Sequence, residues 1–443
     1  MSLLLKNANC VDATAGFTTP TLRDVLIIGE KIESLGEPGC FDSLAQAQPA
    51  DPTGPLEICD LAGKLLFPGL MDMHVHLRDP GFEYKEDIET GTRAAAHGGF
   101  SAVLAMANTN PVIDTGSLVN HVHEKARQKA VVRVYTTGAL TANQAGQALA
   151  EMADMAEAGA VAFSDDGHGV QDAGLMRLAL EYAATIKRPV LVHCQDDALV
   201  GSGQVNEGAV STRLGLAGWP AAGEEVQIAR DIALAEITGA ALHIQHVSTA
   251  RGLQLITAAK AKGMPVTCEV TPHHLFLDEN ELNERYDTNL KMNPPLRTAE
   301  DAQALCEALI EGGIDCVATD HAPHAAHEKS LEFELAPFGV TGLETALSLV
   351  YTRLVATDRM TLAQLVERMA HAPRRILNIE PVSLQAGSTA DLTVFDPQAD
   401  WQVDRDSFLS KSANSAFLGV SLKGCTDAVY INGKVVFTNG GCQ

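Results

Sequence analysis

The middle of the chain alternates short, continuous apolar runs with longer stretches of helical periodicity. Strands buried on both faces give unbroken apolar runs, which is typical of parallel sheets covered by helices. Between the runs, apolar residues recur at three and four positions, which predicts amphipathic helices. The expected helices are residues 144–158, 175–186, 224–237 and 299–311. The expected strands are residues 71–76, 101–107, 132–137, 160–164, 189–193, 242–246, 266–270 and 316–319.

The number of strand–helix units indicates the fold class. Eight parallel strands, each followed by a helix, are the pattern of an α/β protein built as a (β/α)8 TIM barrel. An open, doubly wound sheet is the alternative that this pattern alone leaves open.

Both ends of the chain contain short strands instead of helices. The strand-like segments are residues 3–5, 25–28, 31–33, 390–395 and 429–437. Asn432-Gly433 is a strong hairpin turn, and the Pro-, Asp- and Gly-rich residues 48–55 predict an exposed loop. We therefore expect a small β-sandwich module made of residues 1–65 and 385–443, and a catalytic barrel made of residues 66–384.

Composition narrows the possible partners. The 443 residues are 46% hydrophobic and 20% charged, which is ordinary for a globular protein. The 32 basic and 56 acidic residues give a net charge of −24, which argues against nucleic acid and anionic membranes as partners. An anionic substrate would have to be attracted by the site itself.

The cysteines and the start of the chain indicate a cytoplasmic protein. The nine cysteines are odd in number and contain no CxxC pair, so we expect reduced, mostly buried thiols. The apolar run at the start is too short for a signal peptide. No run of about 18 apolar residues predicts a membrane span.

Candidate chemistry lies where the expected strands end, which is the active-site face of a TIM barrel. The first run ends in His74-Val75-His76, and residues two apart on a strand share a face. Other runs end at or just before Asp165-Asp166, His193, His246 and Asp320. Imidazole and carboxylate suit Zn²⁺. Six such ligands are more than one tetrahedral zinc ion needs. We therefore expect one or two zinc ions, with two favoured if a carboxylate bridges them.

Three motifs carry a resemblance to a known family. Residues 74–81 (HVHLRDPG), 106–111 (MANTNP) and 318–324 (ATDHAPH) resemble the bacterial type I dihydroorotases of the amidohydrolase superfamily. The resemblance covers nearly the whole chain. It implies a zinc-dependent cyclic amidohydrolase that interconverts N-carbamoyl-L-aspartate and (S)-dihydroorotate in pyrimidine biosynthesis.

The resemblance also implies roles for individual residues. His74, His76 and Asp320 would hold one zinc, His193 and His246 a second, and Asp166 would bridge them, with the adjacent Asp165 as the alternative bridge. Asp320 would be the catalytic proton shuttle. The substrate-binding residues would be His76, Arg78, Asn108, Asn293, His324, Phe338 and Gly339.

The remaining histidines receive no ligand role. We expect His273 and His274 to pack near the site, His243 to point to the opposite face from His246, and His121 and His123 to lie on the solvated surface.

Two rival functions are open at this stage. A hydantoinase would act on a neutral ring and would not need Arg78 and Asn108. In many relatives a carboxylated lysine bridges the metals, whereas Asp166 is the implied bridge here. A metal-free structural partner of aspartate transcarbamoylase would lack the ligands that this chain retains. An active enzyme could still form a homo-oligomer or associate with that transcarbamoylase. Residues 324–340 are a candidate lid.

Overall fold

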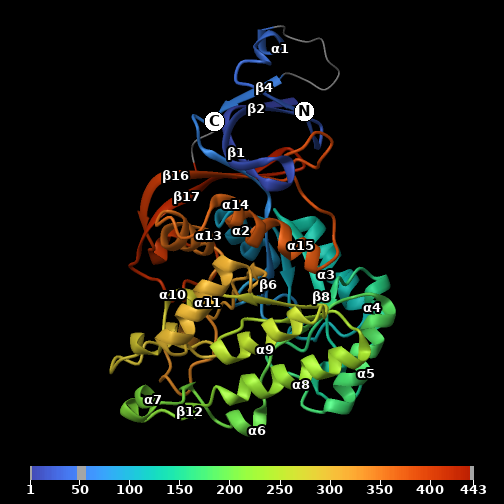
Figure 1. Ribbon diagram of the computed structural model, residues 1–443, viewed down its shortest axis with the longest axis vertical. Helices are drawn as coiled ribbons and strands as arrows, with labels where there is room; N and C mark the ends of the chain where they lie inside the picture. Colours follow the sequence, from blue (N-terminus) through green and yellow to red (C-terminus); the bar gives the residue numbers. More distant parts are fainter. Residues whose placement is uncertain (1, 47–55, 440–443) are drawn as a thin grey trace.

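The computed structural model describes residues 2–46 and 56–439, which form a parallel barrel beneath a curved terminal sheet (Figure 1). The predicted loop at residues 48–55 lies outside the described residues. In Figure 1 the terminal sheet, with β1, β2 and β16, stands at one end of the molecule, and the helix-covered barrel occupies the rest.

All eight expected barrel strands are confirmed, in parallel pairing and in the order β15-β14-β13-β10-β9-β8-β7-β6. Their bounds are β6 (Leu70–Val75), β7 (Phe100–Ala105), β8 (Arg133–Gly138), β9 (Ala162–Phe163), β10 (Val190–Val192), β13 (Leu242–Ile244), β14 (Val266–Val270) and β15 (Cys316–Val317). Val75 forms a parallel bridge with His321, and the His76 N–H donates to the His321 carbonyl at 2.8 Å. This contact joins the first strand to the chain after the last, so the fold is a nearly closed TIM barrel and the open-sheet alternative is wrong.

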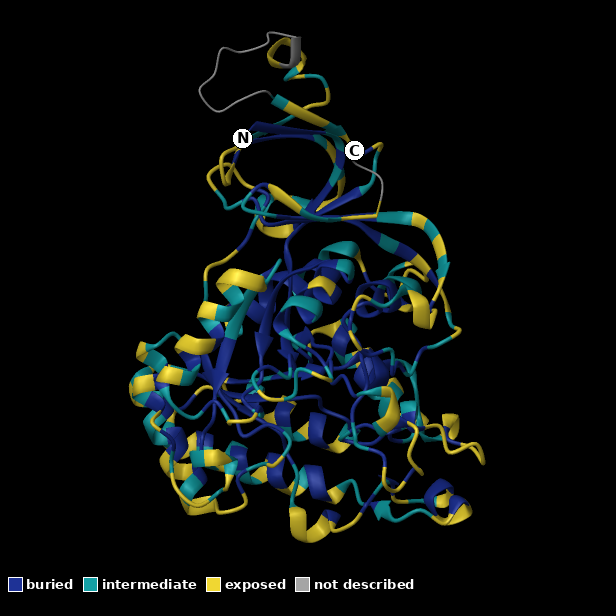
Figure 2. Ribbon diagram, turned by 180° about the vertical axis from the view of Figure 1, so that it is seen from behind, coloured by how far each residue is buried: buried dark blue, intermediate teal, exposed yellow. Residues whose placement is uncertain are grey.

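Helices surround the barrel, with buried residues facing the strands and exposed residues facing outward (Figure 2). The main ones are α2 (Ile88–His97), α3 (Gly116–Lys129), α4 (Met152–Glu157), α5 (Ala173–Ile186), α8 (Ala222–Thr238), α9 (Ala250–Ala261), α11 (Ala299–Glu311), α13 (Ala346–Val350), α14 (Leu362–Val366) and α15 (Ala372–Ile376). Shorter elements in the connections are α1 (Asp42–Gln46), α6 (Asp197–Val200), α7 (Ala209–Leu214), α10 (Pro272–Phe276), α12 (Ala326–Lys329), β11 (Val205–Asn206) and β12 (Gly218–Trp219). Local signals set several boundaries. For example, Thr298 and Asp301 form a capping box at the start of α11.

One predicted helix is largely wrong. Residues 144–158 were expected to be helical, but only α4 at the end of that range is an α-helix. Asn143 and Gln144 have φ angles of 53° and 51°, and Thr141 forms an antiparallel bridge with Leu149. The backbone turns here so that the N–H of Thr141 can reach the buried Asp165 carboxylate at 3.1 Å. This tertiary contact overrides the helical periodicity.

Strands from both ends of the chain form the second eight-stranded sheet, in the order β18-β17-β16-β5-β1-β2-β3, with β4 paired to β1. Their bounds are β1 (Ser2–Asp12), β2 (Phe17–Ile28), β3 (Lys31–Gly36), β4 (Leu56–Asp60), β5 (Leu65–Pro68), β16 (Leu392–Gln402), β17 (Ser421–Ile431) and β18 (Lys434–Thr438). Asn432 and Gly433 make the predicted turn with φ angles of 52° and 73°. The domain boundaries at residues 65 and 385 stay a prediction.

Strand β5 connects the two cores because its side chains alternate between them. Leu65 and Phe67 belong to the main cluster around the barrel, whereas Leu66 belongs to the cluster inside the curved sheet. On the paired strand β16, Phe395 and Val394 alternate in the same way. The terminal sheet is therefore packed directly on the barrel.

Most cysteines match the prediction of free thiols. Cys10, Cys194, Cys268, Cys306 and Cys316 are free and buried, and Cys40 and Cys425 are free with more exposure. Cys59 is disulfide-bonded, so the prediction of reduced thiols is wrong at that position. Within the described residues, no helix has the length and apolar character needed to span a membrane.

We predict that Arg133→Ala lowers the free energy of unfolding by about 2 kcal/mol, which is less than the loss of a fully buried pair because Arg133 is partly exposed. Arg133 Nε lies 2.5 Å from the buried Asp391 carboxylate, and its Nη2 donates to Asn432 at 2.6 Å. These contacts tie β8 to the terminal sheet. Urea unfolding measures the loss. The control is Arg177→Ala, because Arg177 forms an exposed pair with Glu181; equal losses in the two variants would contradict the prediction.

Candidate metal centre and active-site cavity

Six buried side chains converge at the carboxyl ends of the barrel strands. His74 lies on β6, and the others follow the ends of β6, β9, β10, β13 and β15: His76, Asp166, His193, His246 and Asp320. Because parallel strands of a barrel end on one face, residues up to 246 positions apart in the chain become neighbours.

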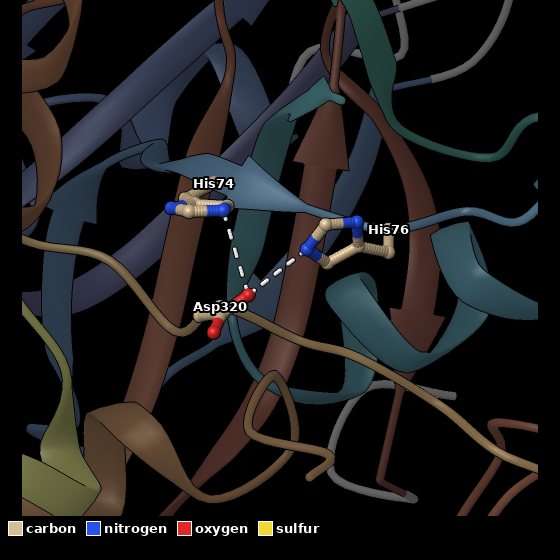
Figure 3. Close-up of side chains that lie close together, drawn as sticks. All are labelled: His74, His76 and Asp320. Carbon is tan, nitrogen blue, oxygen red and sulfur yellow. Dashed lines mark hydrogen bonds and ion pairs between the residues drawn. The ribbon is translucent and has the colours of Figure 1, made fainter. Parts of the chain in front are cut away.

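Asp320 lies between the two histidines of the HxH motif (Figure 3). Its Oδ1 is 3.4 Å from His74 Nε2 and 2.9 Å from His76 Nε2. His74, His76 and Asp320 form one group whose potential ligand atoms all lie within 4.8 Å of one another, and His74, Asp166 and His246 form a second. His74 is common to both groups.

Asp166 faces the histidines from both halves of the cluster. Its Oδ1 lies 3.4 Å from His74 Nε2, 3.6 Å from His193 Nδ1 and 3.8 Å from His246 Nε2. Its Oδ2 lies 3.4 Å from His76 Nε2. A carboxylate with its two oxygens turned toward different imidazoles has the geometry that a bridging ligand requires.

Asp165 points elsewhere. Its carboxylate accepts hydrogen bonds from the Leu140 N–H at 2.8 Å and the Thr141 N–H at 3.1 Å, and also from the Thr141 hydroxyl. These three donors occupy a buried carboxylate that holds the β8–α4 connection. Of the two adjacent aspartates, Asp166 is the one that faces the imidazoles.

The clustered charges shift the pKa values of the group. Burial lowers the pKa of His74, but Asp166, Asp320 and Glu269 outweigh that effect and raise it well above its ordinary value. Burial raises the pKa of Asp166 and Asp320, but the neighbouring imidazoles, His74 foremost, hold both far below the usual range. Asp166 and Asp320 therefore stay ionised, and their two negative charges face the interior of the cluster.

On three of the four histidines, the nitrogen that faces away from the cluster has a partner, as expected for metal-ligating histidines. His74 Nδ1 lies 2.6 Å from Glu269 Oε1, and His76 Nδ1 lies 2.9 Å from Asn108 Oδ1. His193 Nε2 lies 3.1 Å from Gln195 Oε1. These contacts leave Nε2 of His74 and His76, and Nδ1 of His193, for the interior. The donor set thus fits a divalent ion that prefers nitrogen and oxygen ligands.

Glu269 and Gln195 were missed by the sequence analysis. A signal for Glu269 was present, because it is an acidic residue inside the apolar run 266–270, which was expected to be buried. Buried acids need a partner. Gln195 follows His193 by two residues and gave no signal of its own.

A cavity of about 250 Å³ opens from the cluster. All the predicted substrate-binding residues line it, together with Asp166, His193, His246 and Asp320, whereas His74 does not. Its lining residues are His76, Arg78, Asn108, Asp166, Gly167, His193, His246, Asn293, Asp320, Ala322, His324, Phe338 and Gly339.

Arg78 brings positive charge to one side of this cavity. Its Nε donates to the Pro323 carbonyl at 3.2 Å. His324 Nε2 lies 2.8 Å from the Phe338 carbonyl, which can only accept, so this nitrogen carries the proton. It therefore offers no acceptor to Arg78 Nη2, which lies 3.4 Å away. Among the described residues the terminal nitrogens of Arg78 have no other acceptor, so they are free to bind an anion.

Asn293, Phe338 and Gly339 form the opposite wall. The Asn293 amide donates to Gln195 at 3.0 Å, and its buried Oδ1 has no partner in the described part of the chain. Gly339 has a φ of +121°, and a Cβ there would lie 2.7 Å from Ala322 Cβ. The wall thus combines a free acceptor with a position that excludes larger residues.

The other histidines lie largely as expected. His273 and His274 are buried beside the cluster, and His274 Nε2 donates to the Pro294 carbonyl at 3.0 Å. His243 contacts Thr267 and Glu269 rather than the cavity. His121 is exposed, but His123 is half-buried, so the surface assignment of His123 is wrong. It is half-buried because its imidazole packs close to Gly159.

This chain is similar in sequence to dihydroorotases and in fold to a hydantoinase. The family model described as "Dihydro-orotase-like" matches residues 63–251. The dihydroorotase of Pelotomaculum thermopropionicum is 49% identical over 98% of this chain and 98% of its own length. That of Geobacter metallireducens is 48% identical over 99% of this chain and 100% of its own length.

A solved structure of the L-hydantoinase (dihydropyrimidinase) of Arthrobacter aurescens is similar in fold, with a TM-score of 0.86 and 27% identity. The match covers 100% of this chain and 97% of that one.

The two aspartates allow a matched test of their different surroundings. We predict that Asp166→Asn weakens zinc binding by more than about 100-fold, since losing a ligand exceeds the roughly 10–100-fold effect of an outer contact. Asp165→Asn should retain zinc but lose about 1–3 kcal/mol of unfolding free energy, because three buried donors lose a charged acceptor. Chelator competition and urea unfolding measure the two effects. The reverse pattern would assign the metal-facing position to Asp165.

Proposed function

The chain belongs to the dihydroorotase family, and we propose that it catalyses the reversible, zinc-dependent cyclisation of N-carbamoyl-L-aspartate to (S)-dihydroorotate in pyrimidine biosynthesis. The observation that carries the proposal is the free Arg78 guanidinium facing a cavity beside a His/Asp cluster. Dihydroorotate is a cyclic amide with a carboxylate, and the cavity offers a partner for each part.

We propose two zinc ions, although one could suffice. His74, His76 and Asp320 would hold the first, His193 and His246 would hold the second, and Asp166 would be shared by both. Two observations support this arrangement. The potential ligand atoms lie close together, and the outer nitrogens of His74 and His193 have partners of their own. Zinc held there supplies a Lewis acid for the ring carbonyl and makes hydroxide available near neutral pH.

The residues of the chain orient the substrate and move the proton. Arg78 holds the substrate carboxylate through a planar, bidentate contact, with His324 beside it. Asn293 accepts a ring N–H through its unpaired Oδ1, and Phe338 and Gly339 seat the ring. Asp320 accepts a proton from the attacking water and returns it to the leaving ring nitrogen, which a carboxylate can do within one turnover.

Asn108 has a second role in this proposal. Its Oδ1 lies 2.9 Å from His76 Nδ1, and its Nδ2 lies 3.2 Å from Asp166 Oδ2. Both ends of the amide are therefore engaged by proposed metal ligands. Asn108 supports those ligands and contacts the substrate carboxylate at the cavity wall.

A hydantoinase is the second candidate function, because the hydantoinase structure shares the fold across the whole chain. The two activities differ in the charge of the substrate. A neutral hydantoin or dihydrouracil ring leaves Arg78 without a counter-charge, whereas dihydroorotate supplies one.

The finer assignments of partner and location belong to the same proposal. We propose a cytoplasmic enzyme that can form a homo-oligomer and can associate with aspartate transcarbamoylase. The free, mostly buried cysteines support the location, and the resemblance to dihydroorotases supports the association with the transcarbamoylase. Size-exclusion chromatography of the chain alone and with the transcarbamoylase tests both associations.

We expect zinc-loaded protein to consume dihydroorotate, and ultraviolet absorbance measures this consumption. The activity should be lost when a chelator removes the zinc and should return when zinc is added. Asp320→Ala should lower kcat by about 10²–10⁴-fold, because it removes a general acid–base together with a ligand. Protein that holds zinc but turns over neither dihydroorotate nor N-carbamoyl-aspartate would exclude the proposed reaction.

Arg78→Met should lower kcat/KM for dihydroorotate by about 10–100-fold, since a hydrogen bond between charged groups contributes about 1.5–3 kcal/mol. Turnover of dihydrouracil, which lacks the carboxylate, should change little. The control is Lys64→Met, because Lys64 contacts Asp427 at 2.7 Å and does not line the cavity. If the Arg78 and Lys64 variants lose dihydroorotate turnover equally, Arg78 does not bind the carboxylate directly.

A further inference from the structure

Glu269 is a fully buried carboxylate inside the barrel that no proposed catalytic step uses. It lies on β14, a strand that contributes no proposed metal ligand, and its side chain has 0% exposure. A buried charge needs strong partners. Those of Glu269 are two imidazoles and one backbone N–H, on two other strands of the barrel.

Each oxygen of Glu269 has its own partners. Oε1 lies 2.6 Å from His74 Nδ1 on β6 and 3.4 Å from the His246 N–H just after β13. Oε2 lies 3.2 Å from His243 Nε2 on β13. One carboxylate therefore connects the HxH strand to the strand that precedes His246.

The short contact also decides which nitrogen of His74 is protonated. Gln245 Nε2 lies 3.2 Å from His74 Nδ1 and could donate to it only if that nitrogen were bare. A carboxylate at 2.6 Å is the closer and stronger partner, and it accepts a proton. Nδ1 therefore carries a proton, and Nε2, on the side of Asp166 and Asp320, is the nitrogen that remains for a metal.

We propose that Glu269 is a positioning residue for the metal centre. It holds the His74 ring so that Nε2 faces the metal, and it links β6 to the chain that leads from β13 to His246. The inference rests on the proposed function for its metal, but not on the identity of the substrate. His76 and His193 are supported by the neutral amides of Asn108 and Gln195. The charged partner thus serves the one histidine shared by both ligand groups.

Glu269→Gln is the decisive variant, because it keeps the shape and an acceptor for His74 but removes the charge. His243 can adapt to the amide by changing tautomer, since its Nδ1 contacts a hydroxyl, Thr267 Oγ1, that can donate or accept. We expect zinc affinity, measured by chelator competition, to fall by about 10–100-fold. In proton NMR of the zinc-loaded protein, the His74 Nδ1–H resonance should move upfield.

Asp12→Asn is the matched control. Asp12 is a fully buried carboxylate that lies 3.1 Å from His371 Nε2, in a pair that does not line the cavity. This variant should lose stability but keep the zinc affinity and the His74 resonance of the unaltered protein.

The two variants separate positioning from general stability. Equal loss of zinc affinity in both, or unchanged affinity in Glu269→Gln, would overturn the proposal. Zinc binding is measured without substrate, so its outcome is independent of turnover. The unaltered protein could fail to act on dihydroorotate while Glu269→Gln still binds zinc more weakly. That result would contradict the proposed reaction but would support the role of Glu269.

Discussion

The structure of the site depends on holding several like-charged and titratable groups together in a buried space. Asp166, Asp320 and Glu269 are all buried, and each is stable there because imidazoles surround it. His74 contacts all three carboxylates, at 3.4 Å, 3.4 Å and 2.6 Å. Since a buried charge without a partner is very costly, these side chains constrain one another's positions.

Barrel closure makes this arrangement possible. The His76 N–H bonds the His321 carbonyl, so the chain after β15 lies against the chain after β6. That contact brings Asp320 between His74 and His76. The terminal sheet packs on the barrel through β5 and β16, whose alternating side chains enter both cores. A rigid scaffold of this kind suits a centre whose ligands come from several separate strands.

The cavity shows how an acidic protein can take an anionic substrate. The whole chain carries −24, but the cavity wall contains Arg78 with free donors and a neutral His324. Burial and the nearby cations Arg78, Lys85 and Lys329 lower the pKa of His324 to about 2, so this imidazole stays uncharged. Attraction is therefore local and directional, and a carboxylate can be held without a generally positive surface.

The sequence by itself determined the eight strands and five of the six residues of the cluster, because buried parallel strands give apolar runs and their ends carry the polar residues. Periodicity is a local property, and it was misleading at residues 144–158, where the bond from Thr141 to Asp165 bends the backbone. Only the tertiary structure closed the barrel and showed that Asp166, not Asp165, faces the imidazoles. It also revealed Glu269 and Gln195 behind the histidines and showed that both ends of Asn108 are engaged. These features depend on distances between strands far apart in the chain, which no local pattern of residues encodes.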